Sequence, residues 1–484
     1  MSINLLLHDP FCVLKDYPEH YTGIINTYPF KAVVQRYNPT GDYLASGCKD
    51  GSIIIYDMDT QKLIMYLGKN PVFGENNDAA FQTKCLNENH QDEILSLEWS
   101  HCGRYILSAG KDNVVKVWDL ACSHKKMVEN TQLAFEKGRN ECCCKSFEFD
   151  TSIHEARFIK SNQGLAIVCT KKSCLPYVID IQKNTTESIQ KYFDHTVADG
   201  DLNNESLLSE ILSNEKKYGI ATSSLVTDKK LFVGSSKGWC FVYDINDNDN
   251  DNIIINSYFK TGSSSIKNLL INNSMDTLYI NSADRVIRQF DVLNKNINGK
   301  ITMDVSLKQK YQDVINRLQW NDITLSPHNG DFLAASANGA NKDTGLFLWD
   351  TINGSLVKIY ENSGEQLYRI DWDPNNMSIA ASGCESGDIF CWEVSLPPKW
   401  ASLAPDFEEV DEQVKYIEQE DEFDEQDNDY LKKDQNKFET EIKNLDLVTP
   451  DRTDVRGNVN KSHNVFKIPT NYNDILRLRK NIVQ

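Results

Sequence analysis

At 484 residues, the chain is too long for one ordinary compact domain and long enough for one large core or several small ones. Apolar residues make up 40% of it and aromatic residues 10%, a globular composition that excludes a chain disordered along its whole length. The formal charge of −19 is concentrated, because residues 405–430 hold thirteen acidic residues and one lysine, a net −12. The remainder is only mildly acidic, which argues against nucleic-acid binding by the whole chain but leaves room for a local basic patch.

Thirteen cysteines are scattered along the chain, and only Cys142, Cys143 and Cys144 are adjacent. Three adjacent thiols cannot comfortably ligate one tetrahedral metal, and no C-x-x-C pair occurs, so no metal site is expected. Scattered cysteines without a secretory signal indicate reduced thiols. The leucine run at 5–7 is too short for a signal sequence, and no stretch is long enough to span a membrane. These features predict a soluble intracellular protein.

An internal repeat organises the first four hundred residues. Its clearest copies are YNPTGDYLASGCKDGSIIIYD (37–57) and WSHCGRYILSAGKDNVVKVWD (99–119). Each begins with an aromatic residue, continues through a glycine turn, an apolar strand and a Lys-Asp turn, and closes on an aromatic–Asp pair. Weaker copies lie at 158–180, 225–244, 270–291, 325–350 and 372–393. Seven closing dipeptides result, from Tyr56-Asp57 to Trp392-Glu393.

Short segments of alternating apolar and polar residues, separated by Gly, Asp and Asn turns, predict β-strands rather than helices. Short antiparallel strands repeated radially make the blades of a propeller, and seven blades close a ring without long exposed edges. The predicted fold is therefore all-β: a seven-bladed WD40 β-propeller over residues 1–398, then a mostly extended acidic hinge over 399–430 and a tail over 431–484. Polar insertions are expected to be loops at 69–90, 123–147, 184–217 and 246–252.

The second repeat carries His90, Ser108, Asp112 and Trp118, the hydrogen-bonded set of a WD40 blade. A His, a Ser and an Asp in one motif also suggest a catalytic triad. The structural reading is preferred, because no G-x-S-x-G elbow exposes a nucleophile and a buried polar network fixes strand packing. No P-loop, G-x-G-x-x-G or H-E-x-x-H motif occurs, so neither an enzyme nor a bound cofactor is expected.

The chain behind the last repeat differs in character. Prolines at 397, 398 and 405 stop regular structure, and from 408 onward charge blocks replace large apolar residues. Such a segment is expected to be disordered alone. Hydrophobic residues nevertheless interrupt the acidic run, which is typical of a segment that folds onto a partner through charge steering and a few buried anchors.

The segment WASLAPDFEEVDEQVKYIEQEDEFDEQD (400–427) resembles the hinge of the retinoblastoma-binding protein 5 family. INSADRVIRQFD (280–291), YQDVINRLQW (311–320) and GSLVKIY (354–360) are further matches. That family supplies a WD40 core subunit of COMPASS/MLL-type histone H3 lysine 4 methyltransferases, and the modest tail resembles its fungal form. The resemblance implies a nuclear, non-catalytic scaffold that links and activates a SET-domain catalytic subunit.

The resemblance also implies which residues meet which partner. An activation segment at 404–420 would lie against the SET domain and the SPRY-domain subunit through Phe407, Val410, Val414 and Tyr416. A box for the SPRY-domain subunit would consist of Glu422, Phe423, Asp424 and Glu425. A motif for a second, smaller WD40 subunit would contain Leu445, Asp446, Leu447 and Val448. Loops within 300–320 would face the nucleosome through Lys308, Lys310 and Arg317.

Two other functions stay open at this point. One is a WD40 adaptor of a different complex, such as a ubiquitin-ligase substrate receptor whose acidic tail only aids solubility. The other is an enzyme with chemistry in the propeller channel. The hinge motif favours the methyltransferase scaffold over the adaptor, and the missing site residues count against the enzyme.

Overall fold

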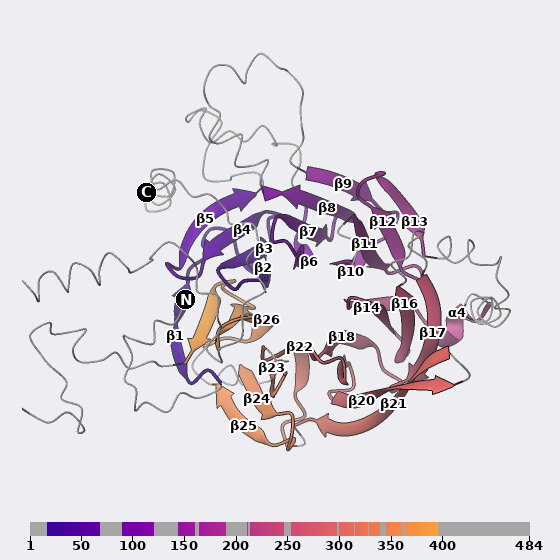
Figure 1. The fold of residues 1–484 in the computed structure, drawn as a ribbon. Helices are drawn as coiled ribbons and strands as arrows, with labels where there is room; N and C mark the ends of the chain where they lie inside the picture. The colour runs from indigo at the N-terminus through magenta and orange to yellow at the C-terminus, as the bar shows by residue number, and fades with distance from the viewer. Residues whose placement is uncertain are drawn as a thin grey trace, which may run out of the picture. The chain divides into compact units, whose positions relative to one another are not determined.

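A computed structural model describes residues 17–67, 90–120, 144–159, 164–189, 211–245, 253–297 and 300–394, apart from short gaps at 212, 314, 328, 339–344 and 361–363. The described residues form seven four-stranded antiparallel sheets around a central axis (Figure 1). The seven-bladed propeller predicted from the repeats is therefore confirmed. A short helix, α4 (Glu215–Tyr218), precedes blade four.

The first six blades each use four strands that follow one another in the sequence, with the first strand innermost. Blade one consists of β2 (Ala32–Tyr37), β3 (Tyr43–Cys48), β4 (Ile53–Asp57) and β5 (Lys62–Leu67). Blade two consists of β6 (Ile94–Trp99), β7 (Tyr105–Gly110), β8 (Val114–Asp119) and β9 (Cys144–Glu148). Blade three consists of β10 (Ile153–Phe158), β11 (Leu165–Thr170), β12 (Tyr177–Asp180) and β13 (Thr185–Ser188).

The next three blades repeat the same order. Blade four consists of β14 (Ala221–Val226), β15 (Lys230–Ser235), β16 (Trp239–Ile245) and β17 (Ile253–Lys260). Blade five consists of β18 (Ile266–Ile271), β19 (Thr277–Ser282), β20 (Ile287–Ile297) and β21 (Lys300–Tyr311). Blade six consists of β22 (Gln319–Leu325), β23 (Phe332–Asn338), β24 (Leu346–Asp350) and β25 (Leu356–Tyr360).

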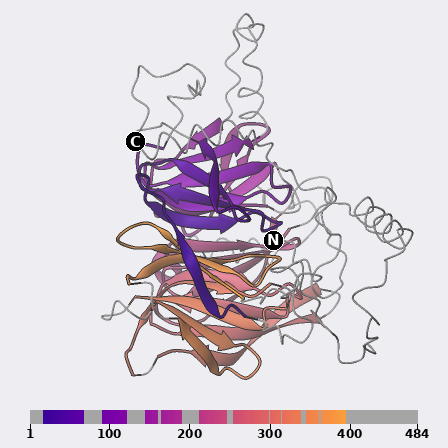
Figure 2. The same cartoon turned by 90° about the vertical axis from the view of Figure 1, so that its left-hand side faces the viewer.

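Blade seven joins the two ends of the propeller. Its inner strands are β26 (Leu367–Trp372), β27 (Ile379–Gly383) and β28 (Ile389–Glu393), and its outer strand is β1 (His20–Ile25). The register pairs Ile24 with Phe390 and Ile25 with Ile389. Figure 2 shows the indigo β1 beside the orange strands of this blade. An early segment of the chain thus closes the ring by main-chain hydrogen bonds to the last repeat.

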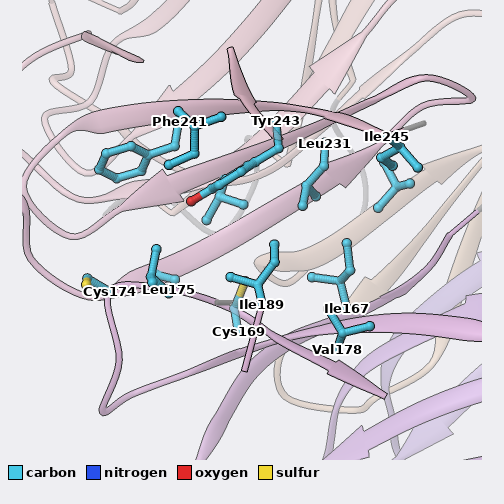
Figure 3. Close-up of a cluster of buried hydrophobic side chains, with 14 of the residues drawn as sticks. Ile167, Cys169, Cys174, Leu175, Val178, Ile189, Leu231, Phe241, Tyr243 and Ile245 are labelled. Carbon is cyan, nitrogen blue, oxygen red and sulfur yellow. The ribbon is translucent and has the colours of Figure 1, made fainter. Parts of the chain in front are cut away.

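The hydrophobic core is divided into seven clusters, one between each pair of neighbouring blades. Figure 3 shows the cluster between blades three and four, where Leu175 and Ile189, which flank strands of blade three, face Phe241 and Tyr243 of β16. Both faces of a blade are covered in this way, so middle strands such as β11 are buried along their whole length. Their burial explains why these strands read as apolar runs more than as alternating ones.

Two of the predicted loop insertions contain structure. The insertion at 123–147 runs into β9, and the insertion at 184–217 contains β13 and the first three residues of α4. The loop prediction failed there because outer strands are short and solvent-facing: Thr185–Ser188 has no fully buried residue. Ile189 and Ile211 within the second insertion, and Tyr218 directly after it, are at most 1% exposed and pack into the cluster between blades three and four.

The acidic hinge (399–430) and the tail (431–484) lie outside the described residues. Among the residues that are described, none forms a helix long and apolar enough to cross a membrane.

Candidate functional site

Four side chains of blade two form one hydrogen-bonded chain. Nδ1 of His90, which precedes β6, lies 3.0 Å from Oδ1 of Asp112 in the turn between β7 and β8. Nε2 of the same ring lies 2.8 Å from Oγ of Ser108 on β7, and Nε1 of Trp118 on β8 donates to that hydroxyl at 2.9 Å. One tautomer satisfies the set: Nδ1 donates to the carboxylate, and Ser108 donates to Nε2 while accepting from Trp118.

Burial shows what this network does. Ser108 and His90 are 0% and 2% exposed, so no substrate reaches the serine hydroxyl. A Cβ on Gly110 would lie 2.4 Å from Oδ1 of Asp112 and 2.5 Å from Nδ1 of His90, so only glycine fits against the pair. The network therefore ties the entry of β6 to the β7–β8 turn and does not present a nucleophile.

Because of the Asp112 carboxyl, the stability that this network contributes depends on pH. Burial alone would raise its pKa, but the hydrogen bond and the electrostatic attraction of His90, with the backbone N–H groups of Gln91 and Val114, hold the pKa below the usual value of 3.8. A depressed pKa contributes stability that is present above the unfolded-state pKa and lost as the pH falls through the folded-state pKa.

We therefore expect protonation of Asp112 to contribute to the acid unfolding of the wild-type protein. The Asp112→Asn variant should lack this contribution. The variant should be less stable at pH 7, because it loses a charge-assisted hydrogen bond, but its unfolding midpoint should fall less steeply between about pH 5 and pH 3. Urea denaturation at a series of pH values measures both quantities. Parallel pH profiles for the two proteins would contradict the assignment.

Polar contacts bridge all seven junctions between blades close to the central axis. Within the described residues, the innermost strand of each blade is the edge of its sheet. The main-chain N–H and C=O groups on its unpaired side therefore need partners from the neighbouring blade. The bridges, from junction 1–2 to junction 7–1, are Trp99 Nε1 to Arg36 O, Phe158 N to Glu98, Ser224 N to Glu155, Thr222 Oγ1 to Ile266 O, Asn268 to Asp322, Ile370 N to Asp322, and Tyr37 N to Asp371.

Arginines on the same innermost strands balance these carboxylates. Arg157 lies 2.7 Å from Glu155 and 3.6 Å from Glu98. Burial alone would lower the pKa of Arg157, but the two carboxylates raise it above its ordinary value. Burial raises the pKa of Asp371, although Arg36 at 3.3 Å opposes this rise. The inner ring therefore consists of paired, partly buried charges that hold neighbouring blades in register.

A cavity of about 270 Å³ opens among these innermost strands, at the end of the channel where they begin. All seven blades contribute to its wall, and its charged residues are Arg36, Lys267, Arg369 and Glu155, with His154 beside them. Among the described residues, no group of three or more His, Cys, Asp or Glu side chains is placed to hold a metal ion.

Most residues that sequence motifs assign to partners are not part of the described structure. This holds for Phe407, Val410, Val414 and Tyr416, for Glu422, Phe423, Asp424 and Glu425, and for Leu445, Asp446, Leu447 and Val448. Lys308 and Lys310 are described and exposed, but they lie on β21 rather than in a loop. The loop expectation was wrong there because β20 and β21 form a long hairpin, and Lys308 pairs with Asp291 at 3.7 Å. Arg317 is exposed in the turn before β22.

Sequence motifs did not reveal the inner ring of charges. A usable signal exists, because a charged residue directly precedes the aromatic residue that ends four of the innermost strands. The four pairs are Arg36-Tyr37, Glu98-Trp99, Arg157-Phe158 and Asp371-Trp372. Alone, each such charge is indistinguishable from a solvated strand residue, and only the ring brings them together.

Comparisons with known proteins agree with this architecture. A model of the family "WD domain, G-beta repeat" matches residues 14–57 and 83–119. The chain is 34% identical over 480 residues to the COMPASS component SWD1 of Saccharomyces cerevisiae, covering 99% of this chain and 100% of that protein. It is 29% identical over 415 residues to the Set1 complex component swd1 of Schizosaccharomyces pombe, covering 86% and 88%.

More distant relatives and a solved structure extend the match. The retinoblastoma-binding protein 5 homolog of Drosophila melanogaster is 26% identical over 406 residues, covering 83% of this chain and 68% of that protein. The crystal structure of the β-propeller domain of Cps50 (Swd1) from Myceliophteria thermophila superposes with a TM-score of 0.58 at 26% identity, covering 78% of this chain and 100% of that domain.

Proposed function

The chain belongs to the Swd1 and retinoblastoma-binding protein 5 family, and from this premise we propose that it is a non-catalytic scaffold subunit of a COMPASS histone H3 lysine 4 methyltransferase complex. One observation carries the proposal: the match to the budding-yeast COMPASS component runs over 99% of this chain at 34% identity. The likeness thus includes the segments behind the propeller as well as the WD40 repeats, which many unrelated proteins share.

A non-catalytic role is consistent with the chemistry of the described residues. The His, Ser and Asp side chains of blade two are hydrogen-bonded to one another in a buried network, and Ser108 is fully buried. The inner-ring carboxylates are likewise paired with arginines or with backbone N–H groups. Polar groups engaged in this way stabilise a rigid ring and are not free to act as an acid, base or nucleophile.

The acidic hinge, residues 399–430, is the proposed link to the catalytic subunit. In this proposal Phe407, Val410, Val414 and Tyr416 contact the SET domain and the SPRY-domain subunit. Binding that favours the active conformation of the SET domain over other conformations raises the active fraction, and only this difference in affinity drives activation. The propeller would provide a rigid base, while residues 445–448 in the tail would bind a smaller WD40 subunit.

Nuclear residence and a nucleosome contact through Lys308, Lys310 and Arg317 complete the proposal. Replacing all three residues with glutamine should lower the affinity of the assembled complex for nucleosomes and make that affinity depend less on salt. Binding would then neutralise fewer phosphates and release fewer counterions. Unchanged affinity and salt slope in a gel-shift titration would remove these residues from the interface. Fluorescence microscopy of the tagged chain tests the nuclear location.

Co-purification tests the function as a whole. A tagged full-length chain should retain a SET-domain protein through gel filtration, together with H3 lysine 4 methyltransferase activity. Isolation of the chain with ubiquitin-ligase subunits and without a SET-domain protein would refute the scaffold role and favour the adaptor function. Methyl transfer by the purified chain alone would contradict the non-catalytic assignment.

A further inference from the structure

Cations outnumber carboxylates among the residues that line the cavity at the channel mouth. Arg36, Lys267 and Arg369 line it, against the single carboxylate of Glu155. That carboxylate is already engaged, since Oε1 lies 2.7 Å from Arg157 and Oε2 accepts a hydrogen bond from Ser224 N at 2.8 Å. Two of the three cations are engaged as well, because Arg36 lies 3.3 Å from Asp371 and Arg369 lies 3.6 Å from Asp322. Lys267 is the cation of the wall that forms no ion pair within the described residues.

The cations keep unused hydrogen-bonding capacity. Lys267 donates to Trp320 O at 2.8 Å, which uses one of its three N–H donors. Arg369 lies 3.6 Å from Asp322, and its buried Nε has no hydrogen-bond partner within the described part of the chain. An unsatisfied donor of a charged group is costly when it is buried, so an acceptor placed here would relieve that cost.

Electrostatics point in the same direction. Burial lowers the pKa of Lys267, and the nearby positive charge of Arg369 lowers it further, although Asp322 partly offsets these effects. Burial and Arg157 oppose the charged form of Arg369, but Asp322 and Glu155 raise its pKa above the ordinary value. An anion beside Lys267 would offset the burial of this lysine and its repulsion by Arg369, and would favour its charged form.

Size limits the ligand. Pockets for drug-sized molecules occupy roughly 300–1,000 Å³, and the cavity of about 270 Å³ is smaller than that. It matches a single small anionic group better than a nucleotide or an organic cofactor. Planar guanidinium groups and an ammonium are the side chains that recognise carboxylate and phosphate oxygens.

We propose that the channel mouth, lined by Arg36, Lys267 and Arg369, is a binding site for one small oxyanion, a carboxylate or a phosphate group. Its lining residues all belong to the propeller, and the proposal does not depend on the scaffold function. The source of the oxyanion is a free anion in solution, and inorganic phosphate serves as the probe.

Calorimetric titration of the full-length protein with inorganic phosphate, at constant ionic strength, tests the site directly. A specific site gives saturable binding in the calorimeter and a melting temperature that rises with the logarithm of the phosphate concentration above the dissociation constant. Phosphate also stabilises proteins generally by exclusion from their surface, an effect that grows steadily with concentration and does not saturate.

Substitutions separate these two effects. Lys267→Gln should weaken phosphate binding about tenfold, the cost of one charge-assisted hydrogen bond. Lys62→Gln, at an exposed lysine on the outer strand β5, should leave binding unchanged. Equal loss in both variants would overturn the proposal, because it would indicate only a general effect of net charge.

Absence of saturable phosphate binding to the wild-type protein would refute the site. Saturable binding that Lys267→Gln weakens and Lys62→Gln preserves is the result that supports it.

Discussion

Replacing Phe423 and Glu422 with alanine is expected to weaken binding of the full-length chain to the SPRY-domain subunit by about a hundredfold or more. Phe423 is the one aromatic residue in the acidic run 418–429, and a buried aromatic anchor contributes at least about 2 kcal/mol when truncated. Loss of a charge from a complementary, partly buried pair costs a similar amount or more. Isothermal titration calorimetry or surface plasmon resonance measures the change.

The tail contains a matched control for this variant. Phe438→Ala with Glu439→Ala removes the same two residue types outside the box, and binding should be preserved. Binding of the wild type should weaken clearly from low to moderate salt if charge steering contributes, because exposed charges are screened over about 10 Å at 0.1 M salt. Unchanged affinity of the Phe423/Glu422 variant for the SPRY-domain subunit would contradict the assignment of this box as its binding site.

Ile25→Asp is expected to destabilise the propeller by more than about 4 kcal/mol. Ile25 on β1 is 4% exposed and packs into the cluster between blades seven and one. The substitution removes a large apolar side chain from the core and buries a carboxylate without a partner. Because β1 is the outer strand of blade seven, its release would also expose the edge of β28 and promote aggregation.

The neighbouring residue provides the control. Ile24, in the same strand as Ile25, is 52% exposed and pairs with Phe390 of β28. Ile24→Asp therefore changes the same residue type on the other face of β1. Its cost should stay within about 1 kcal/mol, the range of strand propensities. Urea unfolding midpoints and the monomer fraction in gel filtration report both effects. Similar losses in the two variants would show that the packing of β1 does not close the ring.

Ring closure bears on the proposed scaffold role. Seven apolar clusters and seven polar bridges connect the blades, so each blade is held by both of its neighbours. A structure closed in this way has no terminal blade that can fray, unlike a linear repeat array. A rigid base of this kind reduces the ordering cost for flexible segments that bind a partner, since only those segments lose freedom on binding.

The repeat pattern alone determined that this chain is a seven-bladed propeller. Each copy marks the second and third strands of a blade with turn residues, an apolar run and a closing aromatic–acid pair, and these local signals survive in the sequence because both strands are buried on both faces. The hinge motif likewise indicated the family, since its acids and spaced hydrophobic residues are contiguous in the chain.

Only the tertiary structure decided which strand closes the ring, where the outer strands lie, and which charges form the inner ring. The partners involved, such as Ile25 and Ile389 or Tyr37 and Asp371, lie hundreds of residues apart, so no local pattern records their pairing. Outer strands such as β13 are short and polar because one side faces solvent, which makes them look like loops. The cations at the channel mouth become a site only when seven separate strands bring them around one cavity.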